Sequence, residues 1–270
     1  MSEGFCGANE EIVVAKSMLH YFEEPVISGK NGSGAVFFSG CNLRCSFCQN
    51  SAISRHVSGK TVQSKDLADI FFALEEKGAH NINLVTATHF LDGVIPALEI
   101  FKRRSSLPIV YNCGGYESVQ SLKQLDGLVD VYLPDFKYCD NDLAKRLSSA
   151  PNYKEVAIDA IGEMVRQQPV PVFHEDEAQE CDIMEKGVIV RQLLLPGQLQ
   201  DAKKIVKYLH ENYGNQIYLS LMSQFTPLPH VEKYPELNRK VSPRTYEKYI
   251  DYCLDLGVEQ GFIQEGEVAE

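Results

Sequence analysis

The sequence lacks long apolar runs and extended basic stretches. It has no uninterrupted apolar run of about 18 residues, the length that a membrane-spanning helix needs. Its N-terminus has neither the basic start nor the apolar core of a secretory signal, so we expect a cytoplasmic protein without membrane contact. The net charge of −11 and the lack of clustered Lys and Arg argue against nucleic-acid binding, because phosphate contacts need such clusters.

The composition is that of a folded α/β protein. The chain has 270 residues, of which 44% are apolar, and this is sufficient for one large domain with a full core. It contains eight cysteines. In a chain of this size without a secretory signal, they are better explained as ligands and reduced thiols than as disulfides.

Three of the cysteines, Cys41, Cys45 and Cys48, form a C-x3-C-x2-C loop. Three thiolates at this spacing can hold one face of an iron–sulfur cube and leave the fourth iron open. A structural zinc site needs four ligands, and no second pair lies nearby. An electron-transfer cluster also needs four cysteines, in spacings that are absent here. Incidental buried thiols are a poorer explanation, because the flanking glycine, asparagines and Phe47 fit a tight ligand loop.

The loop resembles the signature of the radical S-adenosylmethionine (SAM) superfamily, in which an aromatic residue such as Phe47 precedes the third cysteine. The segments 34–54 and 23–29 are similar to the PflX-like branch, proteins assigned as pyruvate formate-lyase activating enzymes. The resemblance extends from residue 4 to the C-terminus, is strongest at the cysteine loop and is weakest after Pro227.

Beyond the loop, apolar strand-like runs alternate with amphipathic segments, which predicts a parallel sheet with right-handed crossovers. The expected strand and helix pairs are 35–39 with 64–77, 81–86 with 92–104, 108–111 with 117–125, 130–135 with 141–147, 188–195 with 199–213, and 216–221 with 242–256. A further helix candidate and an acidic loop at 174–180 lie between residues 152 and 186. Six such units favour an α/β fold of the partial (β/α)6 barrel type, and the resemblance implies the same barrel. We expect residues 1–30 to pack on it as an N-terminal extension and residues 31–270 to form the radical SAM core domain.

Polar residues follow the predicted strands at their carboxyl ends, where barrel proteins gather their ligands. Lys137 offers an ammonium group for the methionine carboxylate of SAM, and Asn112 offers an amide for the ribose hydroxyls. Asp135 with Lys137 resembles the Asp-x-Lys of the activating enzymes, whose lysine contacts SAM. Asn112 and Arg191 likewise resemble residues of their third-strand and fifth-strand segments.

The second-strand loop departs from the family pattern. The Gly-Gly-Glu-Pro of the activating enzymes is here Thr86, Ala87 and Thr88, followed by His89. Small residues at this place let the backbone approach the methionine amino group, so we expect all three to contact SAM. His89 is expected to be structural or part of the SAM shell rather than a general base.

The other five cysteines lack ferredoxin-like spacing, so we expect no second cluster. They are Cys6, Cys113, Cys139, Cys181 and Cys253. Cys113 and Cys139 follow the third and fourth predicted strands, and for each an inert buried thiol is favoured over a catalytic one.

The resemblance implies that a reduced cluster cleaves SAM to a 5′-deoxyadenosyl radical, which removes a hydrogen atom from a substrate. A flavodoxin or ferredoxin-type reductant would supply the electron. The leading hypothesis for the substrate is a glycine Cα–H in a glycyl-radical enzyme. Two alternatives stay open: oxidation, epimerisation or rearrangement of a peptide or small metabolite, and a non-catalytic iron–sulfur binding or sensing protein. Cluster storage alone needs no SAM pocket, which argues against the last.

Overall fold

The computed structural model describes residues 6, 11–174, 182–228, 231 and 233–264. Cys181 and most of the predicted acidic loop, residues 175–180, lie outside this part of the chain. The strands are β1 (Ile12–His20), β2 (Ser33–Phe38), β3 (Lys60–Val62), β4 (Ile82–Val85), β5 (Ile109–Cys113), β6 (Val131–Pro134), β7 (Val172–His174), β8 (Ile183–Leu193), β9 (Tyr218–Met222) and β10 (Gly261–Gln264).

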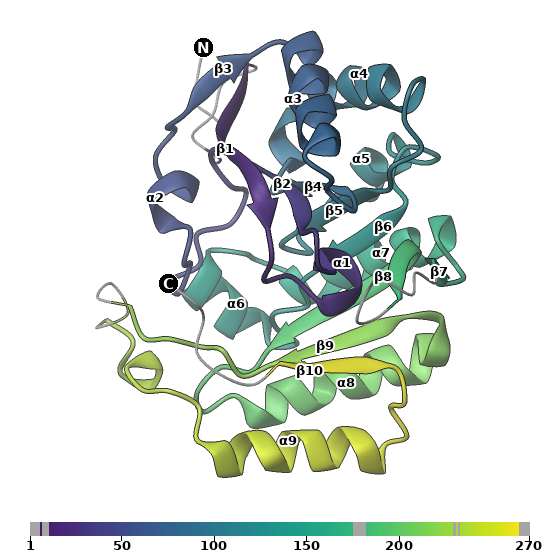
Figure 1. Cartoon of the computed structure of the whole chain (residues 1–270). Coiled ribbons are helices and arrows are strands. Elements are labelled where there is room, and N and C mark those ends of the chain that lie inside the picture. Colours follow the sequence, from purple (N-terminus) through teal and green to yellow (C-terminus); the bar gives the residue numbers. More distant parts are fainter. Residues whose placement is uncertain (1–5, 7–10, 175–181, 229–230, 232, 265–270) are drawn as a thin grey trace.

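Helices follow most of the strands (Figure 1). The α-helices are α1 (Pro25–Ser28), α2 (Ser51–Ser54), α3 (Ser64–Glu76), α4 (Leu91–Lys102), α5 (Val119–Lys123), α6 (Asn141–Ser148), α7 (Tyr153–Gln167), α8 (Leu199–Tyr213) and α9 (Pro243–Asp255). Short 3-10 turns are η1 (Thr88–Phe90), η2 (Gly214–Gln216) and η4 (Pro235–Leu237).

The strands form one curved sheet in the order β10-β9-β8-β6-β5-β4-β2-β1-β3, and β7 pairs with β8. The run from β2 to β10 is parallel throughout. All six predicted strand–helix units are present, which confirms the mixed α/β fold of the partial-barrel type. The structure adds four strands that the sequence pattern did not indicate: β1, β3 and β7, which are antiparallel to their neighbours, and the further parallel strand β10.

Helix α3 shows how the sequence determines where a helix begins and which of its faces packs on the sheet. Its N-cap is Gln63, and Gln63 and Asp66 form a reciprocal capping box. Apolar residues recur at helical spacing and are buried against the sheet: Leu67, Ala68, Phe71 and Leu74. Phe71 meets Phe101 of α4 edge to face at 5.7 Å between ring centroids, so the two helices share one core layer.

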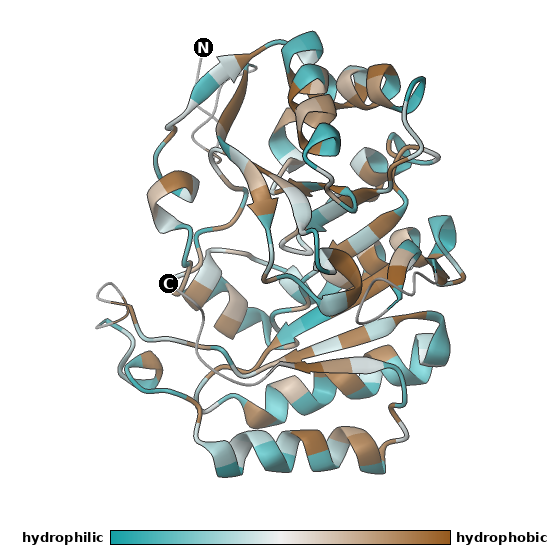
Figure 2. Cartoon of the chain, in the orientation of Figure 1, coloured by the Kyte–Doolittle hydropathy of each residue, from teal (hydrophilic) through white to brown (hydrophobic). Residues whose placement is uncertain are grey.

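The central parallel strands are buried along their whole length. Every residue of β2, β5 and β6 is buried, as expected for parallel strands that are covered on both faces. Figure 2 shows hydrophobic and hydrophilic residues alternating around the helices. No helix in the described ranges is both long and apolar enough to cross a membrane.

The segment before the barrel forms part of the sheet. Strand β1 pairs antiparallel with β2, and the chain then turns at Glu23 and Glu24 into α1. Both glutamates are well covered, with Glu24 only 1% exposed. This route brings two carboxyl groups to the mouth of the barrel, where the candidate site lies.

The loop after β5 gives a test of the fold. Gly115 has φ +75°, and an added Cβ would collide with the carbonyl oxygen of Asp135. Gly127 has nearly the same φ, +78°, but open space around it. We expect Gly127→Ala to cost only the backbone strain, about 1 kcal/mol, with unchanged SAM affinity. Gly115→Ala should cost clearly more and weaken SAM binding, because Asp135 is displaced.

Denaturant unfolding and SAM titration calorimetry on both variants provide the check. Equal losses of stability with equal SAM affinity would show that the contact between Gly115 and Asp135 is not a constraint on the site.

Candidate active site

A cavity of about 290 Å³ lies at the carboxyl ends of the parallel strands. We call it the inner cavity. Most of the predicted site residues line it: Cys41, Cys45, Phe47, Cys48, Thr86, Asn112, Asp135, Lys137 and Arg191. Residues as far apart in sequence as Cys41 and Arg191 therefore meet at one place, as the barrel topology requires.

The C-terminal turn of α6 holds the cysteine loop. The backbone N–H groups of Arg44 and Ser46 donate to the carbonyl oxygens of Ser148 and Leu147, at 2.9 and 2.7 Å. The Ser148 hydroxyl also donates to Cys45 Sγ at 3.1 Å. These bonds fix the loop against a regular element, so the three thiols keep a defined arrangement.

The thiols suit a cluster better than a single ion. Among the described residues, no group of three or more His, Cys, Asp or Glu side chains is gathered so that it could hold one metal ion. A cube of four irons spreads its cysteine ligands over three corners, and three thiols around one cavity fit that demand. Two effects raise the pKa of Cys41 to about 12: burial is the larger one, and the charge of nearby Cys45 is the second. Burial likewise raises the pKa of Cys45. Bound iron would offset this cost by stabilising the thiolates.

Arg191 is the centre of the polar network beside the thiols. Its Nη2 donates to Asn112 Oδ1 at 2.5 Å, its Nε to Asp135 Oδ1 at 3.0 Å, and its Nη1 to Glu23 Oε2 at 3.1 Å. Glu23 in turn accepts from the amides of Asn83 and Asn112 through Oε1. One side chain from β8 thus connects β5, the loop after β6 and the segment before the barrel.

Asp135 and Lys137 form an ion pair next to this network. Burial alone would raise the pKa of Asp135, but Arg191 and Lys137 outweigh it and hold that pKa below its usual value. Burial alone would lower the pKa of Lys137, but Asp135 outweighs it and holds that pKa above its usual value. Both groups are therefore charged at neutral pH, and the Lys137 ammonium is available to a carboxylate ligand.

The second-strand loop only partly matches its expected role. Thr86 lines the inner cavity with φ +63°, an uncommon conformation for a threonine, and its N–H donates to Asn112 O at 2.9 Å. Ala87 is fully buried, and the Thr88 hydroxyl donates to Glu117 Oε1 at 2.9 Å. Neither of these side chains lines the cavity, so their contact with SAM stays a prediction.

Glu117 is a site residue that the sequence analysis missed. It is 2% exposed, and its carboxyl oxygens accept a hydrogen bond from the Thr88 hydroxyl and another, at 3.1 Å, from the Tyr111 hydroxyl. Burial raises the pKa of Glu117 to about 7. The carboxyl joins the loop after β4 to strand β5 and so supports the strained turn at Thr86.

Two further residues act as supports. Tyr153, at the start of α7, is fully buried; its hydroxyl accepts the Lys137 N–H at 3.0 Å and lies 2.8 Å from Gly114 O. His89 Nε2 lies 2.7 Å from Ser39 O, and burial lowers the pKa of this imidazole, which agrees with a structural role.

Cys113 lines the inner cavity but is buried, and burial raises the pKa of its thiol.

A second, larger cavity of about 680 Å³ adjoins the first. We call it the outer cavity. It is bordered by the segment after β1, including Tyr21, Phe22 and Glu23, and by Ile263 of β10.

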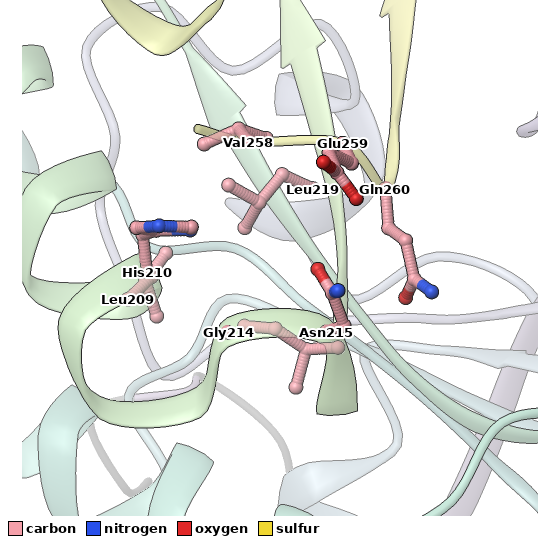
Figure 3. Close-up of a pocket in the computed structure, with 9 residues that line it drawn as sticks. Leu209, His210, Gly214, Asn215, Leu219, Val258, Glu259 and Gln260 are labelled. Atoms are coloured by element: carbon pink, nitrogen blue, oxygen red, sulfur yellow. The ribbon is translucent and has the colours of Figure 1, made fainter. Parts of the chain in front are cut away.

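A third hollow lies near the amino ends of the strands, between residues 214–216 before β9 and 258–260 before β10 (Figure 3). Its walls close so tightly that no water-sized space remains. Of these three hollows, the inner and outer cavities are the two with room for a ligand.

The buried carboxyl of Glu117 gives a pH-dependent test. Because its pKa is about 7 in the fold against 4.5 as a free group, the folded protein binds the extra proton between these values. The stability of the wild type should therefore fall as pH rises through this window. Glu117→Gln removes this loss, so its stability relative to the wild type should increase by up to about 3 kcal/mol between pH 4.5 and 7.

Thermal unfolding of wild type and variant across that pH range provides the measurement, with the exposed Glu99→Gln as the surface control. A Glu117→Gln difference that does not change with pH would contradict the raised pKa.

Comparison with known proteins agrees with this site. The Radical SAM superfamily model matches residues 35–184, more than half of the chain. The uncharacterized protein MJ0674 of Methanocaldococcus jannaschii is 29% identical over 267 residues, covering 94% of this chain and 71% of that protein.

Solved structures show the same fold at low identity. SuiB of Streptococcus suis bound to S-adenosylmethionine matches with a TM-score of 0.57 and 13% identity over 84% of this chain; the chain spans only 48% of that protein. A domain of pyruvate-formate lyase-activating enzyme from Bacteroides vulgatus matches with a TM-score of 0.50 and 12% identity, covering 69% of this chain and all of that domain. The family match, which includes the three-cysteine loop, shows that the chain belongs to the radical SAM superfamily, whose cofactors are a 4Fe–4S cluster and S-adenosylmethionine.

Proposed function

We propose that Cys41, Cys45 and Cys48 hold the 4Fe–4S cluster and that the chain uses it with SAM to remove a hydrogen atom from a protein substrate. The observation that carries this proposal is the meeting of the three thiols with Asn112 and the pair of Asp135 and Lys137 in one cavity. When bound, the cluster and SAM supply one-electron cleavage of the sulfonium to methionine and a 5′-deoxyadenosyl radical, which takes the hydrogen atom.

The role of the chain's own residues is to bind SAM and to orient it in the inner cavity. Lys137 is charged and faces the cavity, so it can pair with the methionine carboxylate. Asn112 accepts from Arg191 and donates to Glu23, which fixes the orientation of its amide at the cavity wall. Phe47 packs edge to face on Phe225 at 6.2 Å, and together the two rings form an apolar wall that limits water at the radical.

For the substrate, we propose the glycine Cα–H of a glycyl-radical enzyme, as in the activating-enzyme branch. The outer cavity supports a large partner, because its border carries exposed apolar side chains: Tyr21 is 51%, Phe22 68% and Ile263 53% exposed. We propose a flavodoxin or ferredoxin-type protein as the electron donor. The division into an N-terminal extension, residues 1–30, and a core, residues 31–270, is part of the same proposal, with Glu23 as the extension's contribution to the site.

The test combines anaerobic cluster reconstitution, reduction with dithionite, SAM and a candidate glycyl-radical protein. We expect 5′-deoxyadenosine and a glycyl doublet in electron spin resonance from the wild type. Cys45→Ala should cleave SAM at least 100-fold more slowly than the wild type, because one cluster ligand is missing. This corresponds to an increase of about 2.7 kcal/mol in the activation free energy.

Cleavage without a doublet for any partner would reject the glycyl substrate but keep the radical chemistry. Equal cleavage by Cys45→Ala would reject the assignment of the cluster ligands.

A further inference from the structure

The inner and outer cavities adjoin each other, because seven residues line both of them. The shared wall consists of Gln49, Asn50, Val85, Asn112, Arg191, Met222 and Gln224. A ligand in the outer cavity therefore contacts residues that also line the space beside the three thiols. We call this shared wall the junction.

The charges at the junction are already paired. Of the residues that line both cavities, Arg191 alone is charged, and it is bonded to Glu23 at 3.1 Å and to Asp135 at 3.0 Å. A second ion that enters here must break an existing pair, and a buried charge that loses its partner is costly. The junction is therefore poorly suited to a zwitterionic amino acid or to a phosphorylated metabolite.

The junction also carries uncharged side-chain amides that are not engaged in hydrogen bonds with other described residues. The side chains of Gln49, Asn50 and Gln224 make no hydrogen bond to any other residue in the described parts of the chain. Each carboxamide offers both a donor and an acceptor, the same combination that a peptide group presents. Three such groups around one opening match the main chain of a polypeptide.

Their positions in the fold support this match. Gln49 and Asn50 directly follow Cys48 in the loop after β2, whereas Gln224 follows β9. In the parallel part of the sheet, four strands, β4, β5, β6 and β8, lie between β2 and β9 in the order. Amides from both sides of the barrel therefore border the same opening, so a chain passing through it can bond on two sides.

The border of the outer cavity adds recognition of side chains. Tyr21, Phe22 and Ile263 expose apolar surface there. Lys16 also lines the outer cavity; it lies 4.4 Å from the centroid of the Phe37 ring and forms no ion pair with any described residue. The border thus fits a segment that carries both an apolar and an acidic side chain.

We propose that the junction binds an extended polypeptide segment through its main-chain amide groups, with Gln49, Asn50 and Gln224 as the specificity-determining residues. This inference rests on the proposed function and specifies how its substrate is held. It assigns the outer cavity to the peptide and predicts that free amino acids and phosphorylated metabolites bind there more weakly than the peptide.

The test uses capped hexapeptides with the protein reconstituted anaerobically and saturated with SAM. The probes are acetyl-Ala-Phe-Ser-Gly-Asp-Ala-amide and the peptide of reversed order, because the direction of the segment is not fixed by the junction. Each has an analogue in which esters replace the two peptide bonds that flank glycine, which removes two N–H donors without adding bulk. Calorimetry measures the dissociation constants.

We expect at least one peptide to bind and its ester analogue to bind about tenfold more weakly, since two hydrogen bonds are lost. Gln224→Leu should weaken the parent peptide several-fold and reduce the difference between peptide and ester. Gln120→Leu, an exposed glutamine on α5, is the matched control and should change neither.

The proposal is overturned if no peptide binds at millimolar concentration, if esters bind as well as peptides, or if Gln224→Leu has no effect. It is also overturned if free glycine or glycerol phosphate competes with the peptide at equal concentration. SAM cleavage by the same wild-type preparation separates the two ideas. Cleavage without peptide binding rejects only the junction, whereas absence of both SAM binding and cleavage rejects the proposed function.

Discussion

The guanidinium of Arg191 is the constraint on which the site depends. It reaches Asn112 on β5, Asp135 after β6 and Glu23 before the barrel, so one planar group ties three separate segments to β8. Such a fork cannot be replaced by lysine without losing bonds. Removing one partner of a buried pair of this kind costs about 3–5 kcal/mol, because it leaves an uncompensated charge. The residues around Arg191 that line the inner cavity are therefore held in place as one unit.

This constraint explains why the segment before the barrel belongs to the functional unit. Strand β1 extends the sheet beyond β2, and the turn after it delivers Glu23 to Arg191. The same turn exposes Tyr21 and Phe22 at the border of the outer cavity. One short segment thus closes the polar network through Glu23 and presents the apolar side chains of Tyr21 and Phe22 to the outer cavity.

Local pattern predicted much of the fold and the cysteine loop, but not the supports of the site. Strand–helix alternation and the C-x3-C-x2-C spacing are visible in short windows, and the family match confirms the family they indicated. Glu23 and Arg191 are 168 positions apart, and Lys137 meets the Tyr153 hydroxyl only because α7 folds back. Glu117 is an ordinary loop glutamate in sequence and becomes a buried carboxyl only after packing. Strand β10 was missed because its four residues carry no clear period.

The central claim is that three cysteines hold a cluster with one open iron and that the Arg191 network places SAM at that iron. Mössbauer spectroscopy of protein reconstituted anaerobically with isotopically enriched iron tests it most directly, with and without SAM. The account predicts that SAM changes the isomer shift of one iron of the four and leaves the other three unchanged. Four unchanged irons, in a sample where calorimetry shows SAM to be bound, would contradict it.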